Sequence, residues 1–253
     1  MTTDSPPFAA GSRWTARLTH LSIRLTAGAV IIAAIGLTAA RYDLIPKLAG
    51  FGGLLAGALL ALIALLAGIG ALIAGRGGAA EGRGKLLAAL AVSLVYVGFI
   101  ASRPLVAGDI PAIHDVTTDL ANPPQFEVLT LRADNLAGVG TADNWKKLHA
   151  GAYGDIAPVT LAKPVTEATA QVTALATTKG WAIAKSDPAR GHVEATASVS
   201  YVRFNDDVVI RITPTADGKG SQVDMRSVSR VGISDFGVNA KRVRAFLKDL
   251  TAG

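Results

Sequence analysis

The sequence predicts an α+β protein in which three transmembrane helices precede a two-layer domain, an antiparallel sheet with two covering helices and a long wrapping segment. Two observations support this division. Residues 1–102 contain three apolar stretches without a charged residue, and residues 103–253 contain no such stretch. Instead, the later residues show the alternation of half-buried strands and the spacing of amphipathic helices.

The three apolar stretches have the length and composition of membrane spans. They are Leu25–Ala40, Leu48–Gly75 and Leu86–Ser102. A helix rises about 1.5 Å per residue and needs about 20 mostly apolar residues to cross the hydrocarbon layer. The second stretch is long enough alone. The other two are bordered by Lys or Arg, whose long side chains extend to the headgroups.

The distribution of charge predicts how the chain is threaded. Residues 1–102 hold eight Lys or Arg against three Asp or Glu. These cations gather in the tail, residues 1–24, and in the loop after the second span, so both are expected in the cytoplasm. The domain after the spans, 103–253, is then outside. An Ala- and Gly-rich composition indicates a bacterium, which makes this domain periplasmic and the membrane the inner one.

One alternative concerns the first apolar stretch, because Thr38-Ala39-Ala40 resembles a signal-peptide cleavage site. The segment before that stretch would be 24 residues long, and two further apolar stretches follow. We therefore favour an uncleaved anchor.

Composition also argues against several classes of function. The chain has no cysteine, which excludes disulfides, thiol catalysis and cysteine-ligated zinc. Residues 103–253 hold seventeen basic against sixteen acidic residues, so we expect no basic face for nucleic acid. No ionisable residue interrupts a span, which argues against an ion path.

Small residues recur along one side of the second span at Gly53, Gly57, Ala61 and Gly68. Such spacing lets helix backbones approach closely. We favour packing within this three-helix unit, and the alternative is docking onto another membrane protein.

The outer domain shows an ordered series of predicted elements. These are a strand at 159–162, a helix at 164–178, strands at 181–183, 193–201, 207–213 and 222–230, and a helix at 239–250. The last helix should turn Val243, Phe246 and Leu247 inward. One strand face is apolar, as in Val208, Ile210 and Ile212, and the other is polar, so both helices should cover the apolar face. The segment 109–153, with one short helix at 142–149, is the candidate cover for the polar face of the core, 159–250.

Four stretches of this domain resemble a known family. They are Ile113–Asp119 (IHDVTTD), Asn122–Phe126 (NPPQF), Asp206–Arg211 (DDVVIR) and Met225–Asn239 (MRSVSRVGISDFGVN). Together they resemble domain-of-unknown-function family 1499 over about residues 109–250. The resemblance implies a bacterial membrane-anchored protein, since similar bacterial members also carry amino-terminal membrane helices. It implies no reaction.

The first candidate site comprises His114, Asp115 and Asp119. These residues have the chemistry for metal binding or acid–base catalysis. However, one His with two Asp is a thin ligand set, and Asp and Thr side chains in a tight loop bond local backbone groups. We therefore expect local hydrogen bonds here, with no metal and no cofactor.

The second candidate site consists of polar residues around the last strand and the last helix. They are Arg226, Ser229, Arg230, Asp235, Asn239 and Arg242. One interpretation is an anion or headgroup site with arginine forks beside a helix amino terminus that Asn239 caps. The favoured one is structural, with Asp235 and Asp206 pairing the arginines. Arg226 and Arg230 are expected on one side of a strand, about 6.5–7 Å apart. At that spacing they suit an anionic headgroup or two carboxylates of the wrapping segment, for which Asp115 and Asp119 are the nearest candidates.

Two functional hypotheses follow from these residues. The favoured one is a non-enzymatic envelope protein, embedded in the lipid bilayer, whose outer domain binds a lipid-like or anionic ligand or a neighbouring membrane protein. The alternative is a hydrolase or transferase that uses His114, Asp115 and Asp119 with nearby arginines. No Gly-x-Ser-x-Gly motif occurs. His149 shows no context for a role, and His192 is expected in solvent at a strand edge.

Overall fold

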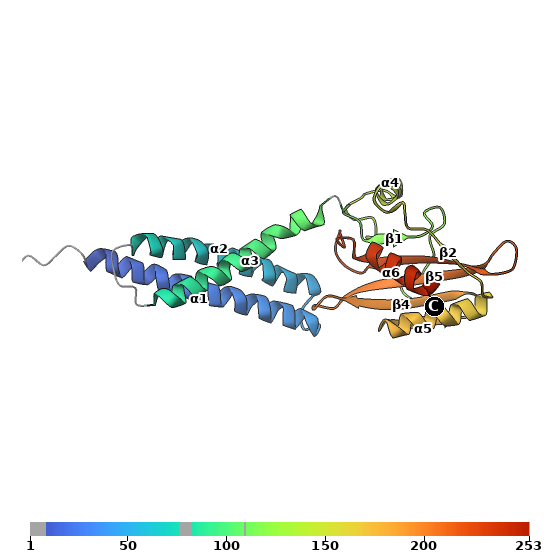
Figure 1. Cartoon of the computed structure of the whole chain (residues 1–253), viewed down its shortest axis with the longest axis horizontal. Coiled ribbons are helices and arrows are strands. Elements are labelled where there is room, and N and C mark those ends of the chain that lie inside the picture. The colour runs from blue at the N-terminus through green and yellow to red at the C-terminus, as the bar shows by residue number, and fades with distance from the viewer. Residues whose placement is uncertain (1–8, 76–81, 109, 253) are drawn as a thin grey trace, which may run out of the picture. The chain divides into compact units, whose positions relative to one another are not determined.

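The computed structural model describes residues 9–75, 82–108 and 110–252, and it divides into two compact units, Met1–Gly108 and Asp109–Gly253 (Figure 1). The first eight residues of the expected cytoplasmic tail and Arg76 of the second loop lie outside the described residues. Each unit has its own core, and each is described separately.

The first unit is built from three long helices. They are α1 (Ala9–Arg41), α2 (Lys47–Ala74) and α3 (Arg83–Ala107). Each contains a segment long and apolar enough to span a membrane: Arg13–Arg41, Lys47–Ala74 and Arg83–Leu105, with hydropathies of 1.9, 2.5 and 2.0. The chain is therefore a membrane protein with three candidate spans.

The small residues of α2 lie where this helix meets its neighbours in the same chain. A Cβ atom on Gly57 would lie 2.7 Å from the Ala29 carbonyl oxygen, and one on Gly68 would lie 2.8 Å from Ser22 Oγ. Ala61 is fully buried between these glycines. Ser22 Oγ also donates a hydrogen bond of 2.8 Å to the Ala64 carbonyl. Small residues thus allow the close approach, and side-chain hydroxyls bridge the helices.

Gly53, the remaining member of this series, is half-buried and faces α1. A Cβ atom there would lie 3.5 Å from the Gly36 Cα atom. All four small residues of α2 therefore serve packing within the unit.

The second unit is a six-stranded antiparallel sheet with three helices. The strands are β1 (Asp115–Thr117), β2 (Val159–Leu161), β3 (Ala182–Asp187), β4 (His192–Val199), β5 (Phe204–Pro214) and β6 (Ser221–Ser229). The order across the sheet is β1-β6-β5-β4-β3, and β2 also pairs with β6. The helices are α4 (Ala142–Tyr153), α5 (Val165–Thr178) and α6 (Val238–Ala252). The predicted α+β class is confirmed.

Two details differ from the expected elements. In the segment 109–153 the sequence predicted one short helix, and the structure adds the strand β1, which pairs with β6 in the register Asp115↔Val228. Three residues are too few to show a periodic pattern, so only the partner strand defines this one. In addition, β4 ends at Val199, and Tyr201 lies in the hairpin turn instead of the strand.

The apolar face of the sheet packs against α5 and α6. Val208, Ile210 and Ile212 alternate toward the helices and are at most 1% exposed. Phe246 of α6 is fully buried, and its ring stacks on Trp181 with centroids 4.9 Å apart. Burial of this face supplies the hydrophobic core of the domain.

The polar face of the sheet is also covered, by the extended segment 119–132. Arg226 on β6 donates to the Pro124 carbonyl over 3.3 Å, and Arg211 on β5 donates to the Asn122 carbonyl over 3.0 Å. Glu194 on β4 is fully buried beneath the same segment. Because the cover bonds through its backbone to strand side chains, it needs no hydrophobic periodicity of its own.

The outer edge of β1 is protected by α4. Trp145 Nε1 donates to the Asp115 carbonyl over 2.9 Å, and His149 Nε2 accepts from the Thr117 N–H over 3.1 Å. Burial lowers the pKa of His149, which favours the neutral imidazole that can accept this bond. Two side chains therefore replace a neighbouring strand, which gives His149 a structural role that the sequence did not indicate.

Candidate functional site

Arg226 forms a buried ion pair with Asp115. Its Nε and Nη2 atoms donate to the two carboxylate oxygens over 2.9 and 2.6 Å, and the two side chains are 7% and 2% exposed. Asn135 Nδ2 donates a further bond of 2.6 Å to the same carboxylate. With Nη1 bonded to Pro124, this guanidinium is engaged on every side. Arg226 therefore joins β6, β1 and the covering segment and is closed to an external ligand.

A second buried network links β5, β6 and α6. Arg242 donates to Asp206 over 2.5 Å and to Ser227 Oγ over 2.9 Å. The Asn239 amide donates to the His114 carbonyl and to Ser229 Oγ, each over 2.9 Å. These side chains lie on the helix side of the sheet and fix α6 to the strands.

Asp235 accepts hydrogen bonds at the start of α6. Its carboxylate accepts from the backbone N–H groups of Gly237 and Asn239 over 2.9 and 2.5 Å. Burial raises its pKa, although these hydrogen bonds act in the opposite direction. The expected cap by the Asn239 side chain is wrong, because that side chain bonds the strands. The expected pairing of Asp206 and Asp235 with the arginines is confirmed in part: Asp206 pairs with Arg242, whereas Asp235 forms no ion pair with an arginine among the described residues.

Arg230, unlike the other arginines of this site, is partly open to solvent. Its Nε and Nη2 atoms donate to the Asp207 carboxylate, each over 2.8 Å, and its side chain is 44% exposed. The expected spacing of 6.5–7 Å from Arg226 is wrong. The two residues lie four positions apart, about 13 Å along a strand, and bind different carboxylates. Asp119 does not pair with Arg230 either, because it binds Arg211 over 3.0 Å.

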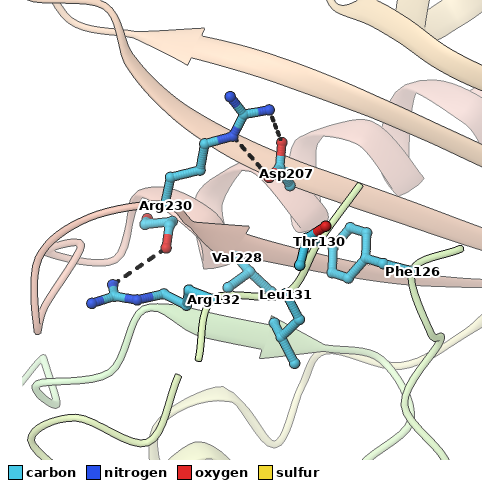
Figure 2. Close-up of a pocket in the computed structure, with 8 residues that line it drawn as sticks. Phe126, Thr130, Leu131, Arg132, Asp207, Val228 and Arg230 are labelled. Atoms are coloured by element: carbon cyan, nitrogen blue, oxygen red, sulfur yellow. Dashed lines mark hydrogen bonds and ion pairs between the residues drawn. The ribbon is translucent and has the colours of Figure 1, made fainter. Parts of the chain in front are cut away.

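A pocket of about 320 Å³ lies beside Arg230 (Figure 2). Its lining comprises Phe126, Thr130, Leu131, Arg132, Asp207, Val228, Ser229 and Arg230. Figure 2 shows the arginine above Asp207 and the apolar side chains of Val228, Leu131 and Phe126 below it. Arg132 donates to the Gly232 carbonyl over 2.7 Å and pairs with Asp134. The lining therefore combines an apolar wall with two arginines and one carboxylate.

The first candidate set does not converge. His114 Nδ1 lies 3.0 Å from the Ile233 carbonyl oxygen, and the residue is 2% exposed. Asp115 lies in a strand, not in the expected tight loop, and is held by Arg226. Asp119 accepts the N–H groups of Asn122 and Ala121, and the first of these bonds contributes most to lowering its pKa.

Each member of this set therefore has a separate environment, and none of the three lines the pocket. Among the described residues, no group of three His, Cys, Asp or Glu lies close enough to hold a metal ion.

The sequence did not indicate the anchor at Glu194. This carboxylate accepts the backbone N–H groups of Glu127 and Leu129, each over 2.6 Å, and that of Val128. His192 Nε2 lies 2.8 Å from it and is buried, not in solvent as expected. Burial by itself raises the pKa of Glu194, but these hydrogen bonds outweigh it and lower the pKa. In the sequence, the one feature that could have indicated this anchor was the charged residue Glu194 within a predicted strand.

Fold and site together define a membrane protein whose second unit is an α+β domain with buried ion pairs. The chain belongs to the family described as protein of unknown function DUF1499, whose model matches residues 115–250, from β1 into α6. The resemblance noted in the four sequence stretches is thus confirmed for this domain. No match was found among curated proteins.

Proposed function

We propose that this chain is a bacterial inner-membrane protein whose outer domain lies in the periplasm and binds a small amphipathic anion without catalysing a reaction. The observation that carries the proposal is the half-exposed guanidinium of Arg230 beside a mostly apolar pocket. The excess of Lys and Arg in the tail and the second loop supports the orientation.

The geometry of Arg230 suits an anionic group. Asp207 holds two of its nitrogen atoms, which orients the guanidinium plane and raises the pKa of the arginine. Its third nitrogen, Nη1, makes no hydrogen bond to any described residue and can donate to a phosphate or carboxylate oxygen. Thr130 adds a hydroxyl to the lining, and Arg132 adds a second guanidinium, which is paired with Asp134.

The size and wall of the pocket limit the rest of the ligand. Phe126, Leu131 and Val228 form an apolar surface that suits a short alkyl group. A volume of about 320 Å³ is at the lower end for small-molecule pockets. The proposed ligand is therefore a phosphate or carboxylate with a short apolar chain, either free or as the head region of a lipid.

The arrangement of acids and bases supports binding over catalysis. Asp207 is the carboxylate in the pocket lining, and it is paired with Arg230. Asp115 and His114 are buried and engaged elsewhere. A general base must reach the proton that it removes, so these residues offer no support for a hydrolase or transferase.

Binding of hexyl phosphate to the full chain in lipid nanodiscs tests the proposal. Calorimetry should detect binding with the parent protein, and Arg230→Ala should weaken it at least tenfold. Arg244→Ala is the matched control, because Arg244 is 43% exposed and binds Asp155 through two hydrogen bonds of 2.6 Å. Empty nanodiscs correct for partitioning of the probe.

The contrary outcomes are distinct. Equal binding by the Arg230→Ala variant and the parent would refute the role of the guanidinium. Hexanol binding as tightly as hexyl phosphate would refute anion recognition. If inorganic phosphate bound as tightly, the apolar wall would have no role and the amphipathic class would be wrong.

A further inference from the structure

One end of the outer domain carries most of its large exposed apolar side chains. The strand register defines this end, because Val199 pairs with Phe204 and Asp206 pairs with Ser229. The β4–β5 hairpin at 200–203 and the loop after β6 at 230–237 therefore lie side by side. Figure 1 shows the β4–β5 hairpin and the β5–β6 turn at opposite ends of the sheet.

The chain also enters the domain at this end. Asp235 donates its backbone N–H to the Ile113 carbonyl over 3.3 Å, and Arg230 donates its own to the Asn205 carbonyl over 3.1 Å. A Cβ atom on Gly237 would lie 3.5 Å from Ile110 Cδ1. The entering segment, the hairpin and the loop thus lie at the same end of the domain.

The composition of this surface is that of a membrane interface. Ile110, Tyr201, Ile233 and Phe236 are 39%, 56%, 54% and 63% exposed. Arg203 is exposed at the hairpin tip and belongs to none of the ion pairs found among the described residues. Aromatic rings with aliphatic side chains and a free cation are typical of segments at the headgroup layer.

Backbone conformation supports the same conclusion. Phe236 has a φ of 54°, and Ser200 and Arg203 in the hairpin have φ values of 64° and 60°. A bulky aromatic residue seldom adopts this left-handed conformation. In Phe236 this strained conformation keeps the aromatic ring exposed, so the ring contributes little to the core of the domain itself.

Covalent connection keeps this end close to lipid, whatever the orientation of the two units. The last candidate span ends at Leu105, and five residues later Ile110 belongs to the surface. An extended chain covers at most about 18 Å over that length. The bilayer with its headgroups exceeds the hydrocarbon layer by about 5–8 Å on each side. The tether therefore leaves this end of the domain near the headgroups.

We propose that the surface formed by Ile110, Tyr201, Ile233, Phe236 and Arg203 inserts into the headgroup layer of the membrane that anchors the chain. Apolar side chains gain by leaving water, and Arg203 meets anionic phosphate groups. This inference is independent of ligand binding in the pocket.

Spin labels on the full chain test the proposal, because the protein has no cysteine and a single introduced one is labelled uniquely. Nitroxides at Phe236→Cys and Tyr201→Cys are compared with one at Lys219→Cys in the β5–β6 turn, in vesicles of phosphatidylethanolamine and phosphatidylglycerol (about 3:1). The first two labels should be relaxed more by oxygen than by a water-soluble nickel chelate. The label at 219 should show the reverse. Identical behaviour at all three positions would overturn the proposal.

A second set of variants separates insertion from other causes of protection. In the Tyr201→Cys background, Ile233→Asp should remove the preference for oxygen. Val128→Asp, at an apolar residue that is 57% exposed elsewhere, should leave it unchanged. An unaffected label after Ile233→Asp would overturn the proposal. So would spin–spin broadening that disappears on dilution with unlabelled protein, because a second copy would then cover the surface.

Discussion

Replacing Arg226 with alanine should lower the free energy of unfolding of the outer domain by about 3–5 kcal/mol. The value follows from burial, since the guanidinium and its Asp115 partner are 7% and 2% exposed. Truncation leaves the carboxylate uncompensated, with the Asn135 amide as its remaining side-chain partner. It also removes the bond to Pro124, so the covering segment loses one of its attachments.

Urea unfolding of the full chain in detergent micelles measures this change. The chain has three tryptophans, and a Trp14→Phe background restricts the emission to Trp145 and Trp181 in the outer domain. Trp145 is a local reporter, because its Nε1 atom bonds the Asp115 carbonyl. Arg244→Ala is the control, and loss of that exposed pair should cost about 1 kcal/mol or less.

A double-mutant cycle decides whether the loss of stability comes from the uncompensated carboxylate of Asp115. Arg226→Ala combined with Asp115→Ala should cost about 2 kcal/mol less than the sum of the two single changes, because the second truncation removes the uncompensated carboxylate. A cost below 1 kcal/mol for Arg226→Ala alone would refute the reasoning. It would mean that water screens this pair as it screens a surface pair.

Three further predictions address the core, the topology and the covering segment. Phe246→Ala should lower the free energy of unfolding by about 3–5 kcal/mol, measured by the same urea titration, because the ring is fully buried against Trp181. Alkaline phosphatase fused after Leu250 should be active in bacterial cells, and green fluorescent protein fused there should stay dark. Glu194 has a lowered pKa in the folded protein. Its stabilising contribution should therefore be complete above the ordinary glutamate pKa of 4.5 and be lost as the pH falls through the lower folded value. Limited proteolysis should then cut the segment 119–132 faster in acid.

Each of these predictions has its own contrary result. A loss well below 1 kcal/mol for Phe246→Ala would show that the ring does not fill the core. An inactive phosphatase fusion together with a fluorescent green fluorescent protein fusion would show that the topology is the opposite of the predicted one. Glu194→Gln should remove most of the acid dependence of cleavage, and an unchanged pH profile in that variant would assign the dependence to another group.

Local pattern and length determined much of this architecture. The three apolar stretches predicted three helices, because crossing a bilayer requires a fixed length of apolar sequence wherever it occurs in a chain. Alternation in 207–213 and 222–230 predicted β5, β6 and their buried faces, since side chains on a strand change sides at every residue. The spacing of Val243, Phe246 and Leu247 likewise predicted the buried face of α6.

Partners distant in sequence were decided only by the tertiary structure. Arg226 and Asp115 are 111 positions apart, and the sequence offered Asp115 and Asp119 as well as Asp206 and Asp235 as candidate partners without deciding among them. β1 exists because β6 offers it an edge, and the segment 119–132 is ordered by Glu194 and Arg226 on the sheet. The sequence states which groups are charged, but burial and pairing depend on which surfaces meet. Arg226 and Arg211 therefore join the sheet to the covering segment, whereas Arg230 lies beside an open pocket, because this segment passes over some strand side chains and not over others.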